Sequence, residues 1–458
     1  MYKKICILFV SLIIFFSVKA QIPNSISATD KVYGLSRFWQ EVNYNFIYLD
    51  KVDRKMWDNK YKELITVVQH TKNDYEYYRE LQKFCALLKD GHTNVNLPRG
   101  IEQMNTMFGD YRLFIENIDG RAIIVRTNLS KKNEVPVGSE IIEVNGKPMQ
   151  KYIDEDVAPY ISSSTDYVLL DWSITGLLKG LEGESYNIKI KKPDGKVAAL
   201  TLTHKKTEEK EVYPAFEPDR KLLDFSWQPG QIAYVGLNSF GDKKIDSLFI
   251  EKLPELYKAK GLIIDLRYNG GGNTEVGTAI LKYLTNDTIL YGSKNRSRLH
   301  IPSYKAWGKF MEVTDTAGNE WAKKAWLSFN DTYYYDFDYS ADTIRLDAKR
   351  IVVPTVILIG HNTASAAEDF LIYADNQKHM KKIGTNTFGS TGQPYMFDLP
   401  GGGSARVCTK QDTYPDGREF VGYGIKPDVE VKQTLADYIQ KTDPALNKAV
   451  GYLQKQLK

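Results

Sequence analysis

Residues 354–368 read Pro354-Thr-Val-Ile-Leu-Ile-Gly-His-Asn-Thr-Ala-Ser-Ala-Ala-Glu368, and this stretch decides how the chain folds. The apolar, β-branched run from Pro354 to Ile359 predicts a buried strand. The segment from Thr363 to Asp369 predicts the start of a helix, because acidic residues stand in its first turn. Ser365 is therefore expected where a strand passes into a helix.

A serine at such a junction is well placed to act as a nucleophile. Backbone N–H groups at the start of a helix are unpaired and carry positive potential. They would stabilise the oxyanion that forms when the Ser365 hydroxyl attacks a carbonyl carbon. The small neighbours Ala364, Ala366 and Ala367 would let a substrate backbone approach. The alternative role of Ser365 is simple helix capping, and the strand–serine–helix pattern alone does not decide between the two.

Four blocks of sequence, in the same order, resemble the C-terminal processing (tail-specific) serine peptidases. Thr363–Glu368 resembles the family's Ser-Ala-Ser-Ala-Ser-Glu nucleophile segment, and Gly261–Gly272 resembles its Asp-Leu-Arg-x-Asn-x-Gly-Gly signature. Gly384–Ser390 resembles its Gly-x-x-Thr-x-Gly-Lys segment, and Gly424–Asp428 its closing Gly-x-x-Pro-Asp. The resemblance implies a multi-domain α/β protein with a ClpP/crotonase-like protease core, peptide-bond hydrolysis and no metal or organic cofactor.

The resemblance also raises the question of the general base. In the best-known members the base is the lysine of the Gly-x-x-Thr-x-Gly-Lys segment, but here Ser390 stands at that place. Asp90-Gly-His-Thr93 resembles a segment of the family's tricorn-like branch, where the resemblance implies a histidine base. An imidazole with a pKa of about 6.5 suits a base at neutral pH, whereas a lysine requires strong desolvation. We therefore expect His92 to be the base; the alternative is that catalysis has been lost.

Further site residues follow from the same resemblance. It assigns the oxyanion hole to the backbone N–H groups of Gly271 and Ala366. Glu368 matches the family glutamate and is expected to support the serine, a substrate amine or the loop; its alternative role is to stabilise the helix dipole. Tricorn-like members carry another glutamate just before Gly-x-x-Pro-Asp, where this chain has Val421, with Glu419 two residues earlier.

The first twenty residues predict a signal peptide. Lys3 and Lys4 form a positive region, and an apolar run follows from Ile5 to Val18. This run is shorter than the ~18–20 residues that a membrane-spanning helix needs. We expect cleavage before Gln21 and export to the periplasm or the extracellular space, with no integral membrane span in the mature chain.

The net charge, the histidines and the cysteines indicate whether nucleic-acid binding, a metal site or disulfide bonds are expected. The net charge of +4 falls to +1 once the three lysines of the predicted signal peptide are removed, which gives no reason to expect nucleic-acid binding. The six histidines form no His-x-x-x-His pattern, so no metal site is expected. Cys85 and Cys408 remain in the mature chain and are able to pair in an oxidising compartment, but two cysteines define no disulfide framework.

Hydrophobic periodicity and resemblance to known families together divide the chain into segments. Pro136–Pro148 resembles the Gly-Asp-x-Ile-x-x-(Ile/Val)-Asn-Gly hairpin of bacterial PDZ domains, with Ser139 where Asp is usual. PDZ domains bind a peptide C-terminus by β-augmentation; the alternative is a β-rich spacer with an Asn-Gly turn. The expected segments are a signal peptide (1–20), a helical N-terminal domain (21–105), a PDZ-like domain (106–205), a linker (206–230), a serine peptidase core (231–435) with an insertion (287–344), and a C-terminal helix (436–458).

These observations predict an exported serine endopeptidase that is directed to the tails of proteins or peptides. Ser365 would be its nucleophile and His92 its base. The alternative from another class is a catalytically inactive ligand- or peptide-binding protein on the same scaffold, and an esterase or lactamase-type hydrolase would use the same residues. The sequence does not determine the oligomeric state.

Overall fold

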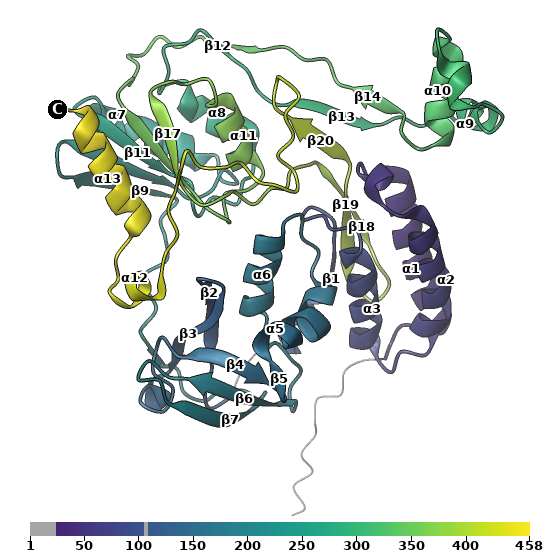
Figure 1. Ribbon diagram of the computed structural model, residues 1–458, viewed down its shortest axis with the longest axis horizontal. Coiled ribbons are helices and arrows are strands. Elements are labelled where there is room, and N and C mark those ends of the chain that lie inside the picture. Colours follow the sequence, from purple (N-terminus) through teal and green to yellow (C-terminus); the bar gives the residue numbers. More distant parts are fainter. Residues whose placement is uncertain (1–23, 105–108) are drawn as a thin grey trace, which may run out of the picture.

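The computed structural model describes residues 24–104 and 109–458, so the expected signal peptide lies outside the described residues. The protein is a mixed α/β molecule of several parts (Figure 1). The chain is organised around a six-stranded sheet with the order β21-β17-β16-β11-β10-β9, parallel except for β9. Its strands are β9 Leu223–Gln228, β10 Ile232–Leu237, β11 Gly261–Asp265, β16 Thr355–Ile359, β17 Met380–Gly384 and β21 Val429–Glu430.

Side chains of successive strand residues point to opposite faces of this sheet, and both faces are covered by helices. On one face, Ile357 and Ile359 of β16 pack in a core with residues of α7, α8 and α11. On the other, Val356 and Leu358 pack in a core with residues of α13. The helices are α7 Lys244–Leu256, α8 Thr274–Leu281, α11 Ala366–Tyr373 and α13 Pro444–Gln456. The expected α/β core and the buried strand before Ser365 are confirmed.

The N-terminal helices do not form a core of their own. The helices α1 Ala28–Asn45, α2 Arg54–Gln69 and α3 Asp74–Ala86 share one core with the three-stranded sheet β1-β19-β18. Strand β1 (Asn94–Asn96) belongs to the N-terminal part, whereas β18 (Pro394–Asp398) and β19 (Ser404–Cys408) come from the C-terminal part. Antiparallel pairing of β1 with β19 therefore fixes the segment just before β1, which contains His92, against the C-terminal part.

A second sheet, with the order β2-β3-β4-β6-β7, includes the hairpin in which β4 pairs with β5. Asn145 and Gly146 both have positive φ (50° and 79°), as an Asn-Gly turn of type I′ requires. Helix α6 packs along the edge strand β2, where Asn117 donates to Asp171 at 2.6 Å. The elements are β2 Phe114–Ile118, β3 Arg121–Asn128, β4 Glu140–Val144, β5 Lys147–Pro148, α5 Met149–Tyr152, α6 Asp166–Thr175, β6 Ser185–Lys191, β7 Val197–Thr203 and β8 Val212–Tyr213.

The insertion at residues 287–344 is an arm that projects from the body (Figure 1). Strand β13 joins the arm to the core by pairing with β20 (Lys410–Thr413). Near its middle the arm rests on α1, where the His300 ring stacks on Tyr44 with centroids 4.1 Å apart. Its elements are β12 Ile289–Leu290, β13 Lys294–Arg298, α9 Pro302–Gly308, α10 Glu320–Phe329, β14 Tyr334–Asp336 and β15 Asp342–Thr343. The remaining helices are α4 Arg99–Met104 and α12 Leu435–Ile439.

Two further expectations concern cysteines and membranes. Cys85 and Cys408 are both buried free thiols in this structure. Among the residues that the structure describes, no helix has the length and apolar character needed to cross a bilayer.

Candidate active site

Ser365 lies at the N-cap of α11 with a backbone conformation that is unusual for an L-residue. Its φ is 56° and its ψ is −124°, a region that costs a non-glycine residue about 1–3 kcal/mol. This sharp turn lets the chain pass from β16 into α11 in a few residues. A half-buried Ser365 is thus held at the start of a helix.

The glycine turn after β11 lies directly against this serine. A Cβ atom on Gly271 would come within 2.7 Å of Ser365 Cβ and 3.0 Å of Ala366 N, and the φ of Gly271 is +98°. Only glycine fits this place without steric conflict. Ala366 begins α11, so its N–H has no acceptor within the helix. The N–H of Gly271 donates to Asn269 Oδ1 at 2.9 Å, so a substrate oxygen would compete with Asn269 for this donor.

An ion pair lies beneath this turn. Arg267 Nη2 lies 2.7 Å from Asp265 Oδ2 and 2.7 Å from a carboxylate oxygen of Asp443, the N-cap residue of α13. Asp265 is buried, so its charge is compensated by the guanidinium. The strand end that leads to Gly271 is thereby joined to the last helix.

Glu368 is fully buried behind Ser365 and ties three segments together. Its carboxylate accepts hydrogen bonds from the N–H of Ser365 (3.1 Å), the N–H of Gly389 (2.8 Å) and the hydroxyl of Thr387 (2.5 Å). Burial raises the pKa of Glu368 to about 8, although these hydrogen bonds and one from the Ser390 backbone act in the opposite direction. Its position supports the loop and the backbone of Ser365.

His92 contacts Ser390, which stands where the resembled family has its lysine. Its Nδ1 lies 2.7 Å from the hydroxyl oxygen of Ser390, a fully buried residue. Ser390 Oγ in turn lies 3.5 Å from Oδ1 of the buried Asp90, which also accepts a hydrogen bond from the Thr93 hydroxyl at 2.6 Å. If His92 donates from Nδ1 to Ser390, and Ser390 donates to Asp90, the tautomer is fixed and Nε2 is left as the basic atom.

The loop Phe388–Ser390 is shared by His92 and the nucleophile segment. Phe388 packs with Ala364 and its N–H donates to Thr363 O at 2.9 Å, so one side of the loop contacts the segment around Ser365. On the other side, Ser390 receives His92. The structure therefore brings the predicted nucleophile segment and the predicted base to one short loop, although they are distant in the sequence.

The environment keeps the imidazole neutral. Burial, together with smaller effects of the nearby cations Arg406 and Lys410, lowers the pKa of His92 to about 4. The neutral form, which is the basic form, is therefore present at all pH values well above 4.

Sequence reasoning missed two residues of this arrangement and considered one that lies elsewhere. Asp90 and the orienting role of Ser390 were not predicted; the only available signal was that Ser390 replaces a lysine while Asp90 precedes His92 by two positions. Glu419 makes contacts with Lys51 at 3.5 Å and Gln411 at 3.0 Å, and it takes no part in the contacts of His92 described above.

Comparisons with known proteins show the family to which the core of the chain belongs. A model of peptidase family S41 matches residues 231–431, which contain the six-stranded sheet, the glycine turn and Ser365. These residues belong to peptidase family S41. The chain is 24% identical over 443 residues to a carboxyl-terminal-processing protease of Picosynechococcus sp., with 95% of this chain and 90% of the relative covered.

Other relatives of this S41 peptidase cover most of its length. A carboxyl-terminal-processing protease of Synechocystis sp. is 23% identical over 436 residues, with 92% of this chain and 86% of the relative covered. The solved structure of mature CPAF complexed with lactacystin aligns over 94% of this chain and 98% of its own, with a TM-score of 0.63 and 14% identity. That likeness shows the fold. The protein is a serine-type peptidase, and its substrate is a protein or peptide.

Replacing Glu368 by glutamine in this S41 peptidase is expected to lower the free energy of unfolding by about 1–3 kcal/mol. An amide nitrogen would face a donor, either the N–H of Ser365 or those of Gly389 and Thr387, because all three donate to the carboxylate. Urea unfolding checks this. The control is Glu275→Gln, an exposed first-turn acid of α8, which should change stability by less than about 1 kcal/mol. Equal effects would mean that Glu368 acts only on the helix dipole.

Proposed function

We propose that this S41 peptidase is an exported serine endopeptidase in which Ser365 is the nucleophile and His92 the general base. The observation that carries the proposal is the 2.7 Å contact between His92 Nδ1 and Ser390 Oγ. It puts an imidazole beside the position that the family lysine would occupy. A strained serine at a helix start, a glycine turn against it, and a neutral imidazole on the loop that packs against the serine's segment are the parts that acyl transfer requires.

The reaction follows from these parts. Ser365 Oγ bonds to the scissile carbonyl carbon while its proton passes to Nε2 of His92, and the carbonyl π electrons move to the oxygen. The Ala366 N–H, with the Gly271 N–H if it leaves Asn269, donates to this oxyanion. Collapse breaks the C–N bond, and His92 returns the proton to the leaving amine. Water then repeats the sequence on the ester, which releases the acid and restores Ser365.

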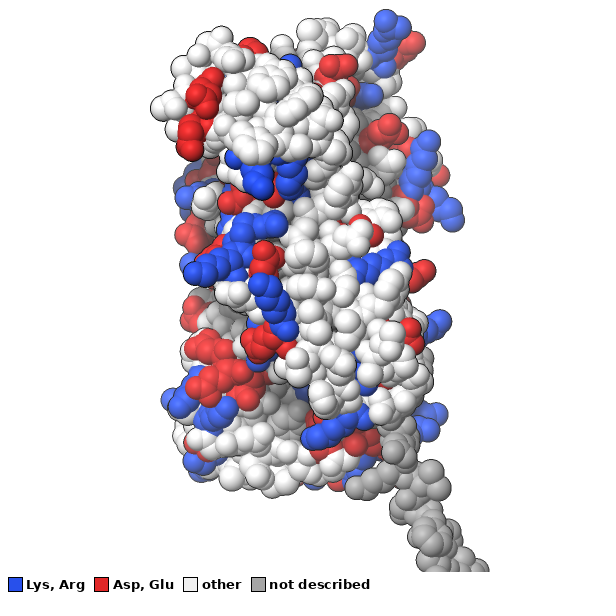
Figure 2. All heavy atoms as spheres, turned by 90° about the vertical axis from the view of Figure 1, so that its right-hand side faces the viewer, with Lys and Arg blue, Asp and Glu red and all other residues white. Residues whose placement is uncertain are grey.

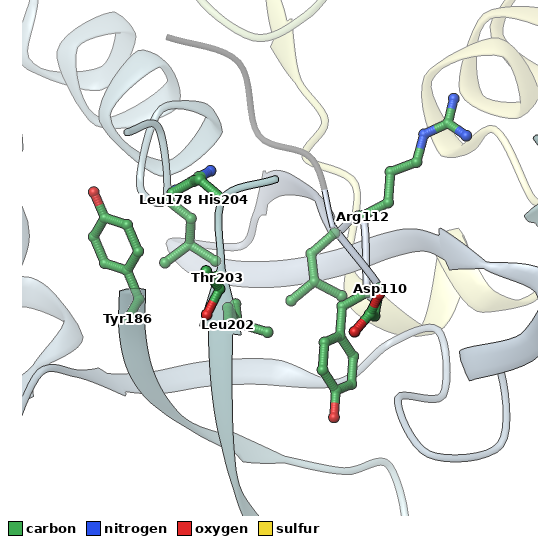
Figure 3. A pocket seen from close by; sticks show the side chains of 9 residues that line it. Asp110, Arg112, Leu178, Tyr186, Leu202, Thr203 and His204 are labelled. Atoms are coloured by element: carbon green, nitrogen blue, oxygen red, sulfur yellow. The ribbon is translucent and has the colours of Figure 1, made fainter. Parts of the chain in front are cut away.

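Tail recognition is proposed for the second sheet, which we interpret as PDZ-like. A pocket lies where β7 ends, next to the segment that leads into β2, with Leu113, Leu178 and Leu202 among its lining residues. Figure 3 shows Leu178, Tyr186 and Leu202 beside one another, whereas the Arg112 side chain points away from them. A tail adding to the open edge of β2 would place its last side chain against this apolar wall.

Helix α6 connects that edge to the catalytic core. Besides Asn117 of β2, Asp171 contacts His361 Nδ1 at 2.6 Å in the loop that precedes Ser365. Tyr167 of the same helix donates to Thr387 O at 2.6 Å. A tail bound along β2 would therefore contact the helix that packs on the nucleophile loop, which supports tail-directed cleavage.

The activity test is hydrolysis of a set of peptides that differ only in carrying a free or an amidated C-terminus. The proposal expects cleavage that Ser365→Ala abolishes and that is faster with the free carboxylate. Equal rates would reject tail direction alone. Retained binding of the peptides without any cleavage, in the wild-type protein, would support the ligand-binding alternative.

Ser390→Ala is expected to lower kcat about tenfold to a hundredfold with little change in KM, since loss of one orienting hydrogen bond costs about 1–3 kcal/mol. Without the Ser390 hydroxyl, His92 loses the acceptor that the structure gives Nδ1, and the required tautomer is no longer held. The matched control is Ser139→Ala, a buried serine in the β-rich part whose hydroxyl donates to Pro136 O at 2.6 Å. Steady-state kinetics on both variants checks this, and equal kcat values would remove Ser390 from the mechanism.

A further inference from the structure

The outer end of the arm exposes large apolar side chains. Trp307 of α9 is 47% exposed, Phe310 80%, Val313 60% and Trp321 of α10 43%. We call these four residues the aromatic tip. Trp307 and Trp321 lie against each other with ring centroids 5.4 Å apart, so residues from both helices form a joint surface.

The packing of α9 on α10 explains why the aromatic side chains face outward. A Cβ atom on Gly308 would collide with the backbone of Ala325, so the helices approach closely through small residues. Ala322, Ala325 and Ser328 are buried in this contact. The small residues therefore form the contact between α9 and α10, and the large apolar residues face outward. A helix pair selected only for stability would bury its large apolar residues instead.

Charged side chains lie around the aromatic tip. Lys309 and Lys324 form no ion pair among the residues that the structure describes, whereas Lys323 lies 4.0 Å from Glu320. Figure 2 faces the end of the arm: the middle of the lobe at its top carries no charged side chains, acidic side chains lie at its left and upper edges, and lysine or arginine side chains lie along its lower border. A surface of tryptophan and phenylalanine with lysines beside it is typical of proteins that lie in the headgroup region of a bilayer.

The size and shape of the surface distinguish a bilayer from a second copy of the chain. An aromatic side chain presents about 150–250 Å² when fully exposed, so the partly exposed tip offers on the order of 500 Å². A stable protein–protein interface needs about 800 Å² from each partner. The tip stands at the end of a projecting arm, where it is accessible to a flat surface (Figure 1).

We propose that the aromatic tip inserts into the interfacial region of a phospholipid bilayer and holds the protein at a membrane surface. Trp307, Phe310, Val313 and Trp321 would enter the boundary between headgroups and acyl chains. Lys309 and Lys324 would face anionic headgroups. This role is independent of the proposed catalytic mechanism, because the tip shares no residue with the active site.

The test is co-sedimentation of the full mature chain with vesicles of phosphatidylcholine and phosphatidylglycerol. The wild-type protein is expected to sediment with the vesicles, and Phe310→Ser/Val313→Ser is expected to lower its partition coefficient about tenfold or more. The matched control is Tyr33→Ser on α1, which is 58% exposed and should sediment like the wild type. Circular dichroism and peptide hydrolysis show that each variant is folded.

Three results would overturn the proposal. They are failure of the wild-type protein to sediment with vesicles, unchanged sedimentation of the double variant, and an equal loss for Tyr33→Ser. Light scattering on the same samples tests for the main competing partner, which is a second copy of the chain. A wild-type dimer that the double variant converts to monomer, with no vesicle binding by either, would make the tip a contact between two copies.

Discussion

Replacing His92 by alanine is expected to lower kcat/KM for peptide hydrolysis by about four to six orders of magnitude. No other imidazole in the described structure contacts Ser390, and a serine hydroxyl without a base is a weak nucleophile. The loss should appear mainly in kcat, because the imidazole acts on the reacting atoms in the transition state rather than on substrate binding.

The surface histidine His70 provides the control for this variant. It stands at the C-cap of α2, where Nδ1 contacts Thr66 O, and His70→Ala should retain wild-type kinetics. Stopped assays over long times are needed to measure the slow His92→Ala reaction. A loss of tenfold or less would show that another group deprotonates the nucleophile.

Ser365 gives the second large effect, and it separates chemistry from stability. Ser365→Ala is expected to lower kcat by about six orders of magnitude, because the reaction then lacks its nucleophile. Ser365→Gly should be equally inactive yet more stable than Ser365→Ala by about 1–2 kcal/mol, since glycine accepts the φ of 56° without strain and its larger loss of backbone entropy offsets only part of this gain.

Urea unfolding of the two variants measures this difference, and peptide hydrolysis confirms that both are inactive. A glycine variant less stable than the alanine variant would mean that the turn at Ser365 stores no backbone strain. Residual hydrolysis by either variant near the wild-type rate would assign the nucleophile to another residue.

The core could be predicted because its signals are local. The apolar, β-branched run from Pro354 to Ile359 predicted β16, which the structure places at Thr355–Ile359. Acidic residues after Ser365 indicated the helix α11. Each of these features depends on residues within a few positions of one another.

The base is different, because its place depends on a contact between distant parts of the chain. His92 reaches Ser390 because β1 pairs with β19, with Asn94 opposite Arg406. The sequence of neither strand indicates which strand it pairs with, and β1 has only three residues. Asp90 was not predicted for the same reason. Its contact with the Ser390 hydroxyl joins two residues that are far apart in the sequence.

The arm shows a third limit. Residues 287–344 lack a clear period because they form short strands and two short helices, and their aromatic residues are divided between small contacts and exposed surface. Sequence periodicity reports burial against one large core. A projecting arm has no such core, so its pattern is weak.

The central claim, that His92 activates Ser365, is tested most directly by the rate at which a fluorophosphonate labels Ser365 as a function of pH, with the labelled residue identified by mass spectrometry. The account predicts that the wild-type rate rises as pH increases through about 4 and is level from there to neutral pH, because the neutral imidazole is the base. It also predicts that His92→Ala is labelled at least about a thousandfold more slowly. Equal labelling of the wild-type and His92→Ala proteins, or a rate that rises only above neutral pH as a lysine base would give, would contradict it.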